Sequence, residues 1–184
     1  RTKMTQILAK KQFKNLPHGL ALEFRLATEK DLPALEWEGE YKHFRRLYHE
    51  TFLRTLKGNT LMWIAVDWNQ KVIGQVFIQL DSSNTALADG KDRAYLFGLR
   101  VRDAHRSQGI GSQMMAFVEQ DLVERGFKLL CLNVARVNTR AFTLYQRLGY
   151  VLMGPDPGVW SYQDDQGKWH YMEEPAWRLE KQLK

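Results

Sequence analysis

The sequence has little cysteine and no long apolar run. Its 184 residues contain one cysteine, Cys131, which excludes an internal disulfide and is typical of a reducing compartment. Because Cys131 lies between two leucines, we expect a packed core thiol there rather than a nucleophile. No apolar stretch reaches the roughly 20 residues that a membrane-spanning helix needs, and the first residues lack the apolar centre of a secretory signal. We therefore predict a cytoplasmic protein without a membrane partner.

Metal-ligand spacings and a broad basic surface are also missing. Of the five histidines, His43 and His49 are six residues apart, not the three or four that share a helix face, so we predict no metal. Most of the formal charge of +6 comes from the N-terminal segment before Glu23, the first acidic residue. This segment contains five basic residues: Arg1, Lys3, Lys10, Lys11 and Lys14. The other 22 basic residues (27 minus 5) nearly balance the 21 acidic ones, so no nucleic-acid partner is expected.

Length and composition favour a single globular domain. The chain is 44% hydrophobic and 12% aromatic, which is enough to bury one substantial core. No repeat or low-complexity linker divides it. We predict a basic N-terminal leader over residues 1–19 and one domain over residues 20–184.

Apolar periodicity predicts alternating strands and helices. In the first half of the chain we expect a strand at 20–27, a helix that begins at the capping-box spacing of 28–31, a helix at 41–56, and a hairpin of strands 61–67 and 72–80. A strand at 95–101, a helix at 112–125, a strand at 128–135 and a helix at 138–148 follow. The chain ends with a strand from 150, which the glycines and prolines of 154–158 interrupt, and with a hairpin whose turn is at 165–167 and whose last strand is at 169–179. This order predicts a mixed α/β sheet.

The junction between the strand at 95–101 and the following helix has the composition of an anion-binding turn. It consists of Arg106-Ser107-Gln108-Gly109-Ile110-Gly111. Two glycines leave the backbone N–H groups unobstructed, and the unpaired donors and dipole of a helix N-terminus favour negative charge. Arg106 adds a cation. Taken alone, the same residues are also typical of an ordinary tight turn.

This turn and a later stretch together resemble the GCN5-related N-acetyltransferase (GNAT) family. The first family motif, a strand ending in valine and then R-x-x-G-x-G, is matched by Val101, Arg106, Gly109 and Gly111. The second, N-x-x-A-x-x-L-Y-x-x-x-G-[FY], is matched by Asn138, Ala141, Leu144, Tyr145, Gly149 and Tyr150. One departure is Asp103, where many members have proline. The resemblance covers residues 20–180 and implies a single-domain, mostly antiparallel sheet flanked by helices, with a splayed central strand pair.

The resemblance implies acetyl-CoA as cofactor and assigns residues to it. Arg106 and the backbone amides of the turn would hold the coenzyme A pyrophosphate: Ser107, Gln108, Gly109, Ile110, Gly111 and Ser112. The backbone of Leu99 and Val101 would pair with the pantetheine arm, and the Val101 N–H would stabilise the oxyanion. Tyr145 would protonate the departing thiolate, although its apolar helical stripe also suits a core residue. Asn138 would lie near the cofactor arm, cap its helix, or both.

The general base and the acceptor site are less defined. In ribosomal-protein N-terminal acetyltransferases of this family a glutamate precedes the second motif, whereas this chain has Asn133, which cannot accept a proton. Remaining alternatives are Glu38, Glu40, Asp67, His170 or a chain of water molecules. The aromatic residues expected to flank the acceptor are Trp37, Tyr41, Phe44, Tyr48, Trp160, Tyr162, Trp169 and Tyr171.

These patterns predict an acetyl-CoA-dependent N-acetyltransferase in which a primary amine attacks the thioester directly in a ternary complex. Asn133 favours a small-molecule amine as acceptor. The alternative acceptor is a peptide or protein amine, at an N-terminus or a lysine. Rival classes are a noncatalytic acyl-CoA sensor and an RNA- or ribosome-associated protein that uses the basic leader. A monomer and a homodimer both remain open.

Overall fold

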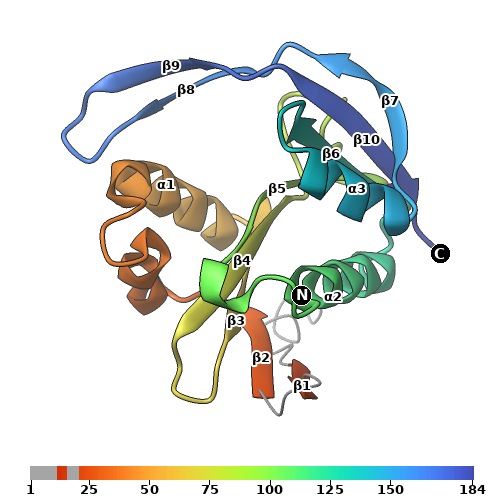
Figure 1. The fold of residues 1–184 in the computed structure, drawn as a ribbon. Helices are drawn as coiled ribbons and strands as arrows, with labels where there is room; N and C mark the ends of the chain where they lie inside the picture. Colours follow the sequence, from red (N-terminus) through yellow and green to blue (C-terminus); the bar gives the residue numbers. More distant parts are fainter. Residues whose placement is uncertain (1–11, 16–20) are drawn as a thin grey trace.

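A computed structural model describes residues 12–15 and 21–184, which are built around one mixed sheet (Figure 1). The eight strands lie in the order β1-β2-β3-β4-β5-β6-β10-β7. Their bounds, in the order of the sheet, are Gln12–Asn15, Ala21–Leu26, Thr60–Val66, Val72–Gln79, Arg93–Val101, Leu129–Ala135, Ala176–Gln182 and Val151–Asp156. Every neighbouring pair is antiparallel except β5 and β6, so the predicted mostly antiparallel α/β sheet is confirmed.

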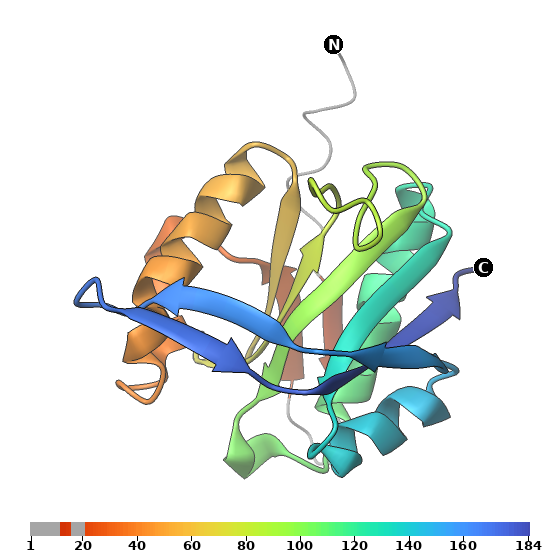
Figure 2. The same ribbon diagram turned by 90° about the horizontal axis from the view of Figure 1, so that it is seen from above.

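Helices pack on both faces of this sheet (Figures 1 and 2). Two 3-10 helices, η1 (Glu29–Glu36) and η2 (Lys42–Phe44), lie with helix α1 (Arg45–Leu56) on one face. Helices α2 (Ile110–Glu124) and α3 (Thr139–Arg147) lie on the other face. A short 3-10 helix, η3 (Asp103–His105), joins β5 to α2.

The central strands are buried on both sides because each face has its own helical layer. In β3, Leu61, Trp63 and Ala65 belong to the core cluster that contains α2, whereas Met62 and Ile64 belong to the cluster that contains α1. Successive strand side chains point to opposite faces. A sheet that is covered on both faces therefore accepts a continuous apolar run.

The C-terminal segment, from Val151 onward, differs from the prediction made from sequence. The expected last strand at 169–179 is divided at Glu174 and Pro175: β9 (Trp169–Glu173) pairs with β8 (Val159–Gln163) in a separate two-stranded sheet, and β10 enters the main sheet between β6 and β7. Strand β7 also continues through Pro155 and ends before Pro157. Proline is tolerated there because β7 is an edge strand, whose outer N–H positions have no ladder partner.

The N-terminal prediction is only partly covered by the structure. Within the predicted leader, Gln12–Asn15 forms β1 and pairs with β2; residues 1–11 and 16–19 lie outside the described residues. In the described part of the chain, no helix combines the length and apolarity needed to cross a membrane.

Strands β5 and β6 separate after a short parallel contact. They pair only from Arg93–Leu96 against Leu129–Leu132. Beyond that point the next residues of β6 pair with β10, and β5 keeps only its pairing with β4. A bulge occurs here at Gly98, where φ is +66° and a Cβ would lie 2.9 Å from Phe77 Cδ2, so glycine is required. The splayed central pair is therefore present.

Candidate active site

The turn after β5 has an open backbone at the start of α2. Gly109 is the N-cap residue of α2, with φ +79°, and no side chain caps the helix. The N–H groups of the first helical turn have no intrahelical partner. A Cβ built on Gly109 would meet nothing within 4 Å. Free donors therefore face open space at the positive end of the helix dipole, which suits a diphosphate.

Two arginines bring positive charge to this turn. Arg106 forms an ion pair with Asp103 (Nη2–Oδ1, 3.0 Å). Asp103, which stands where many family members have proline, therefore orients Arg106, the side chain predicted to bind the pyrophosphate. Arg140 at the start of α3 donates from Nη2 to Ser107 Oγ over 2.6 Å and connects the two motifs in space. Sequence reasoning missed Arg140; its place two residues after Asn138, at a helix N-terminus, was the available signal.

The free edge of β5 presents the backbone of Leu99 and Val101 toward the splay. The Arg102 N–H donates to Ile73 O on β4 over 2.8 Å. Because N–H groups of consecutive residues in an extended strand point to opposite edges, the Val101 N–H points away from β4, toward the gap between β5 and β6. The Leu99 N–H, two residues earlier, has the same orientation.

Tyr145 and Asn138 both have structural roles. Asn138 is the N-cap of α3, and its Oδ1 accepts a hydrogen bond from the Ala141 N–H (3.1 Å). Tyr145 is buried in the α2-side core and lies edge-on to Tyr150 (ring centroids 5.8 Å apart). Burial, reinforced by nearby Tyr95, raises the pKa of Tyr145. The phenol therefore stays protonated at neutral pH, as a proton donor must. The predicted cofactor contact of Asn138 and the acid role of Tyr145 stay predictions.

Two acidic base candidates are already engaged. Arg102 donates to both carboxylate oxygens of Glu38 (2.7 and 3.1 Å), and this hydrogen-bonded pair lowers the pKa of Glu38. Asp67 accepts from two backbone amides of the β3–β4 turn, each over 2.9 Å. Glu40 is exposed. The lowered pKa of Glu38 makes it a weak base for an alkylammonium ion.

The remaining side-chain base candidate, His170, and the excluded Asn133 are also held by neighbours. His170 Nε2 lies 2.8 Å from Asp164 Oδ2, and its ring stacks on Tyr162. Asn133 Oδ1 accepts a hydrogen bond from Arg178 Nε over 2.6 Å. The contacts of the described residues therefore favour none of the side-chain candidates, and a chain of water molecules remains the alternative.

The β8–β9 hairpin lies over α1 and joins two of the predicted aromatic groups (Figures 1 and 2). Phe44 is at the centre of this cluster, with ring centroids 5.0 Å from Tyr162, 6.0 Å from Tyr48 and 6.2 Å from both Trp160 and Tyr41. We call these five residues the aromatic cluster. The other two hairpin aromatics, Trp169 and Tyr171, are exposed by 52% and 82% and lie outside this cluster, and their place beside the acceptor stays a prediction.

Arg100 is the residue of this face that sequence reasoning missed. Its guanidinium lies 3.2 Å from the ring centroid of Tyr41 and 4.4 Å from that of Trp37. Its Nη2 donates to Tyr48 Oη (2.6 Å), Gln75 Oε1 (3.0 Å) and Leu35 O (3.3 Å). A charged residue between two apolar ones at the predicted splay was the signal in the sequence.

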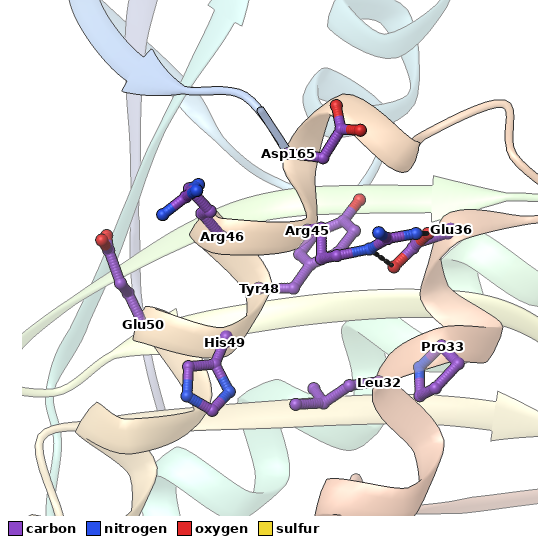
Figure 3. A pocket seen from close by; sticks show the side chains of 9 residues that line it. All are labelled: Leu32, Pro33, Glu36, Arg45, Arg46, Tyr48, His49, Glu50 and Asp165. Atoms are coloured by element: carbon purple, nitrogen blue, oxygen red, sulfur yellow. Dashed lines mark hydrogen bonds and ion pairs between the residues drawn. The ribbon is translucent and has the colours of Figure 1, made fainter. Parts of the chain in front are cut away.

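A cleft of about 540 Å³ lies beside the aromatic cluster, between η1 and α1 (Figure 3). Its lining residues are Leu32, Pro33, Glu36, Arg45, Arg46, Tyr48, His49, Glu50 and Asp165. Arg45 forms an ion pair with Glu36 across it (2.8 Å). None of the predicted cofactor-binding residues lines this cleft, so it lies apart from the predicted cofactor site.

The fold and the two motifs place the chain in a known family. A family model described as Acetyltransferase (GNAT) family matches residues 26–150, and the chain belongs to this family. Members transfer an acetyl group from acetyl-CoA to small-molecule or peptide amines. The predicted family is thereby confirmed, and the predicted N-acetyltransferase class and acetyl-CoA cofactor agree with it.

Among curated proteins, the chain is similar to the probable N-acetyltransferase camello of Xenopus laevis. The two are 30% identical over 128 residues, which cover 65% of this chain and 55% of the relative. The Xenopus tropicalis counterpart is 29% identical over 129 residues with the same coverage. The chain thus spans about half the length of the curated relatives it matches.

Solved structures share the fold at low sequence identity. The GNAT domain of S. lividans PAT has a TM-score of 0.67 at 18% identity, covering 94% of this chain and 97% of that one. The ribosomal-protein-S18-alanine N-acetyltransferase of Escherichia coli has a TM-score of 0.64 at 21% identity, covering 88% and 94%. Arabidopsis thaliana NAA60 in complex with acetyl-CoA has a TM-score of 0.65 at 18% identity, covering 88% and 98%.

Proposed function

We propose that this chain transfers the acetyl group of acetyl-CoA to a primary amine of a small molecule, by direct attack in a ternary complex. The observation that carries the proposal is the splay between β5 and β6, which begins beyond Leu96 and leads to the open turn at Gly109. A strand edge with free backbone groups and a helix N-terminus with free donors are continuous here. Together they match an elongated ligand with a diphosphate at one end.

The residues of the turn and strand have complementary roles in this proposal. Amides at 107–112, with Arg106 and Arg140 beside them, hold the diphosphate. The free edge of β5 at Leu99 and Val101 pairs with the pantetheine arm. When bound, acetyl-CoA supplies an activated thioester. The Val101 N–H, aimed into the splay, donates to the carbonyl oxygen as negative charge develops on it, a contribution typically of about 3 kcal/mol.

Tyr145 serves as the proton donor to the departing sulfur. Its raised pKa keeps the phenol protonated over the pH range in which amines are acetylated. Its hydroxyl makes no hydrogen bond to another described residue, so the proton is not committed to another acceptor in the protein.

Two observations favour a small acceptor over a protein chain. The hairpin packs its aromatic side chains onto η2 and α1, so the aromatic cluster covers part of the face opposite α2. The position of the glutamate base of ribosomal-protein acetyltransferases is Asn133, whose oxygen is occupied by Arg178. The protein-modifying alternative loses support from both features.

The proposal is tested by measuring thiol release from acetyl-CoA with a panel of amino acids, aminoglycosides, polyamines and peptide N-termini. We expect turnover of at least one small amine and calorimetric binding of coenzyme A. Binding without turnover of any amine would identify a noncatalytic acyl-CoA sensor. Absence of coenzyme A binding by folded protein would overturn the proposal.

A further inference from the structure

We propose that Arg100 binds a carboxylate of the acceptor, so that the substrates are amines that also carry a carboxylate, such as amino acids. This inference rests on the proposed acetyl transfer and adds the class of acceptor. Four observations carry it: the position of Arg100 on the α1 face next to Val101, its lack of a carboxylate partner, its unused hydrogen-bond donors, and the fixed position of the guanidinium.

Arg100 lies on the face of the sheet opposite the diphosphate turn. Its neighbours Leu99 and Val101 pack against the core cluster that contains α2. Because successive strand side chains alternate, Arg100 points to the α1 side, where it contacts Tyr41 and Tyr48. It also immediately precedes Val101, the residue whose N–H is assigned to the reacting carbonyl. A group bound at Arg100 is therefore adjacent to the amine that attacks there.

The positive charge of Arg100 has no carboxylate partner among the described residues. Of the acidic residues of the adjoining segment, Glu36 is paired with Arg45 (2.8 Å) and Glu38 with Arg102 (2.7 Å), and the exposed Glu40 forms no ion pair with Arg100. Arg100 is instead surrounded by two aromatic rings, a phenol, an amide and a backbone carbonyl. Removing a charge from water without a counter-charge is unfavourable, so this site favours an anionic ligand.

The donors of Arg100 are only partly used. All three of its hydrogen bonds come from Nη2. Its Nε is buried and has no partner in the described part of the structure, and Nη1 makes no hydrogen bond there either. Because Nη1 is not among the buried atoms without a partner, it is the donor that a carboxylate oxygen can reach, and charge-assisted N–H···O bonds are the strongest hydrogen bonds of this type.

The guanidinium is also held in place before any ligand arrives. Stacking on Tyr41 and Trp37 fixes its plane, and the Tyr48 and Gln75 side chains fix one end. A cation that is already ordered loses little conformational entropy on binding, so more of the interaction appears as affinity.

The test compares amines with and without a carboxylate. Each amino acid is paired with its carboxamide in a series of increasing length: glycine, β-alanine and 4-aminobutyrate with glycinamide, β-alaninamide and 4-aminobutyramide. Thiol release from acetyl-CoA gives kcat and KM for every member. We expect at least one carboxylate to exceed its amide by about tenfold or more in kcat/KM, because only the carboxylate neutralises Arg100.

Variants test whether Arg100 causes the preference for the carboxylate over the amide. Arg100→Gln should raise KM for the carboxylate about tenfold or more, leave the amide unchanged, and so abolish the preference. Arg100→Lys, which keeps the charge, should retain part of it. Arg54→Gln, an exposed charge removal on α1, should leave it intact. Because Arg100 lies on the face opposite the diphosphate turn, unchanged coenzyme A binding by Arg100→Gln shows that the variant is folded.

A binding experiment tests the carboxylate site independently of whether the protein transfers acetyl groups. Tryptophan fluorescence, which includes Trp37 beside Arg100, is titrated with N-acetyl-4-aminobutyrate and N-acetyl-4-aminobutyramide in the presence of coenzyme A. If no amine is acetylated, the transfer proposal fails, and this titration still decides the carboxylate site. Tighter binding of the carboxylate, lost in Arg100→Gln, supports the site. Equal behaviour of carboxylate and amide in the wild type, or an equal loss for both in Arg100→Gln, overturns it.

Discussion

Replacing Gly109 by alanine tests whether the start of α2 holds the cofactor. Gly109 has φ +79°, and a Cβ there would meet no atom within 4 Å. The substitution therefore creates no clash inside the protein, but the added methyl group occupies the open space in front of the free amides. A diphosphate at that position must move away from its donors. We expect coenzyme A affinity to fall by about tenfold or more, which corresponds to about 1.4 kcal/mol.

The substitution of Gly109 also lowers the stability of the fold, and a second glycine, close to the other end of α2, provides a matched control. An alanine with positive φ costs about 1–2 kcal/mol, partly offset by about 0.4–1 kcal/mol from the stiffer unfolded chain. The net loss of about 1 kcal/mol lowers Tm by roughly 2–4 °C for a chain of this length. Gly126, just beyond the other end of α2, has φ +92° and also meets nothing within 4 Å. Gly126→Ala should therefore lower Tm to the same extent.

Isothermal titration calorimetry with coenzyme A then separates binding from stability. We expect Gly126→Ala to keep the wild-type dissociation constant and Gly109→Ala to lose affinity, with both variants equally destabilised in thermal melts. Wild-type affinity in Gly109→Ala would refute the reasoning, because a methyl group could not then occupy the ligand position. Equal weakening in both variants would refute it as well, since the effect would follow stability.

Three further outcomes are expected. Tyr145→Phe should lower kcat about 100-fold or more with little change in the KM for acetyl-CoA, measured by thiol release; full turnover would remove the acid role. Gly158→Ala should displace the β8–β9 hairpin, because its Cβ would lie 1.7 Å from Glu174 O, and should raise the acceptor KM while calorimetric coenzyme A binding persists; an unchanged acceptor KM would contradict this. The hydrogen bond with His170, together with backbone amides, lowers the pKa of Asp164 to about 2. Because this folded-state pKa lies below the usual value near 4, the Asp164 contribution to hairpin stability is present above pH 4 and is lost between pH 4 and 2. Tryptophan fluorescence should show an acid transition in this window that is absent in Asp164→Asn, and identical titrations would count against it.

Local patterns predicted most of the fold. The strands from Thr60 to Val101 and the helix after Gly109 follow from apolar periodicity and glycine placement, because side-chain spacing reports directly on local geometry. The C-terminal strands could not be predicted in the same way. Pro175 is a local signal of a break within 169–179, but the assignment of the two halves to different sheets depends on which distant strands pair with each half.

The site was predictable where it depends on motifs and hidden where it depends on tertiary contacts. Gly109 and Tyr145 are found from spacing along the chain. Arg100 is found only after folding, when Tyr41 and Gln75 from separate elements surround it. The engagement of Asn133 by Arg178 likewise joins two strands that are 45 residues apart in sequence.

The hairpin of β8 and β9 forms its own two-stranded sheet and shares no ladder with the eight central strands. It is anchored to the helical layer by side chains, chiefly Trp160 and Tyr162 against Phe44. Exchanging those side chains therefore removes no hydrogen bond from the scaffold that delivers the thioester. If the proposed reaction is correct, substitutions in this hairpin change the surroundings of the acceptor and leave the acetyl-CoA site intact, so a library confined to its aromatic residues is a route to new amine selectivity.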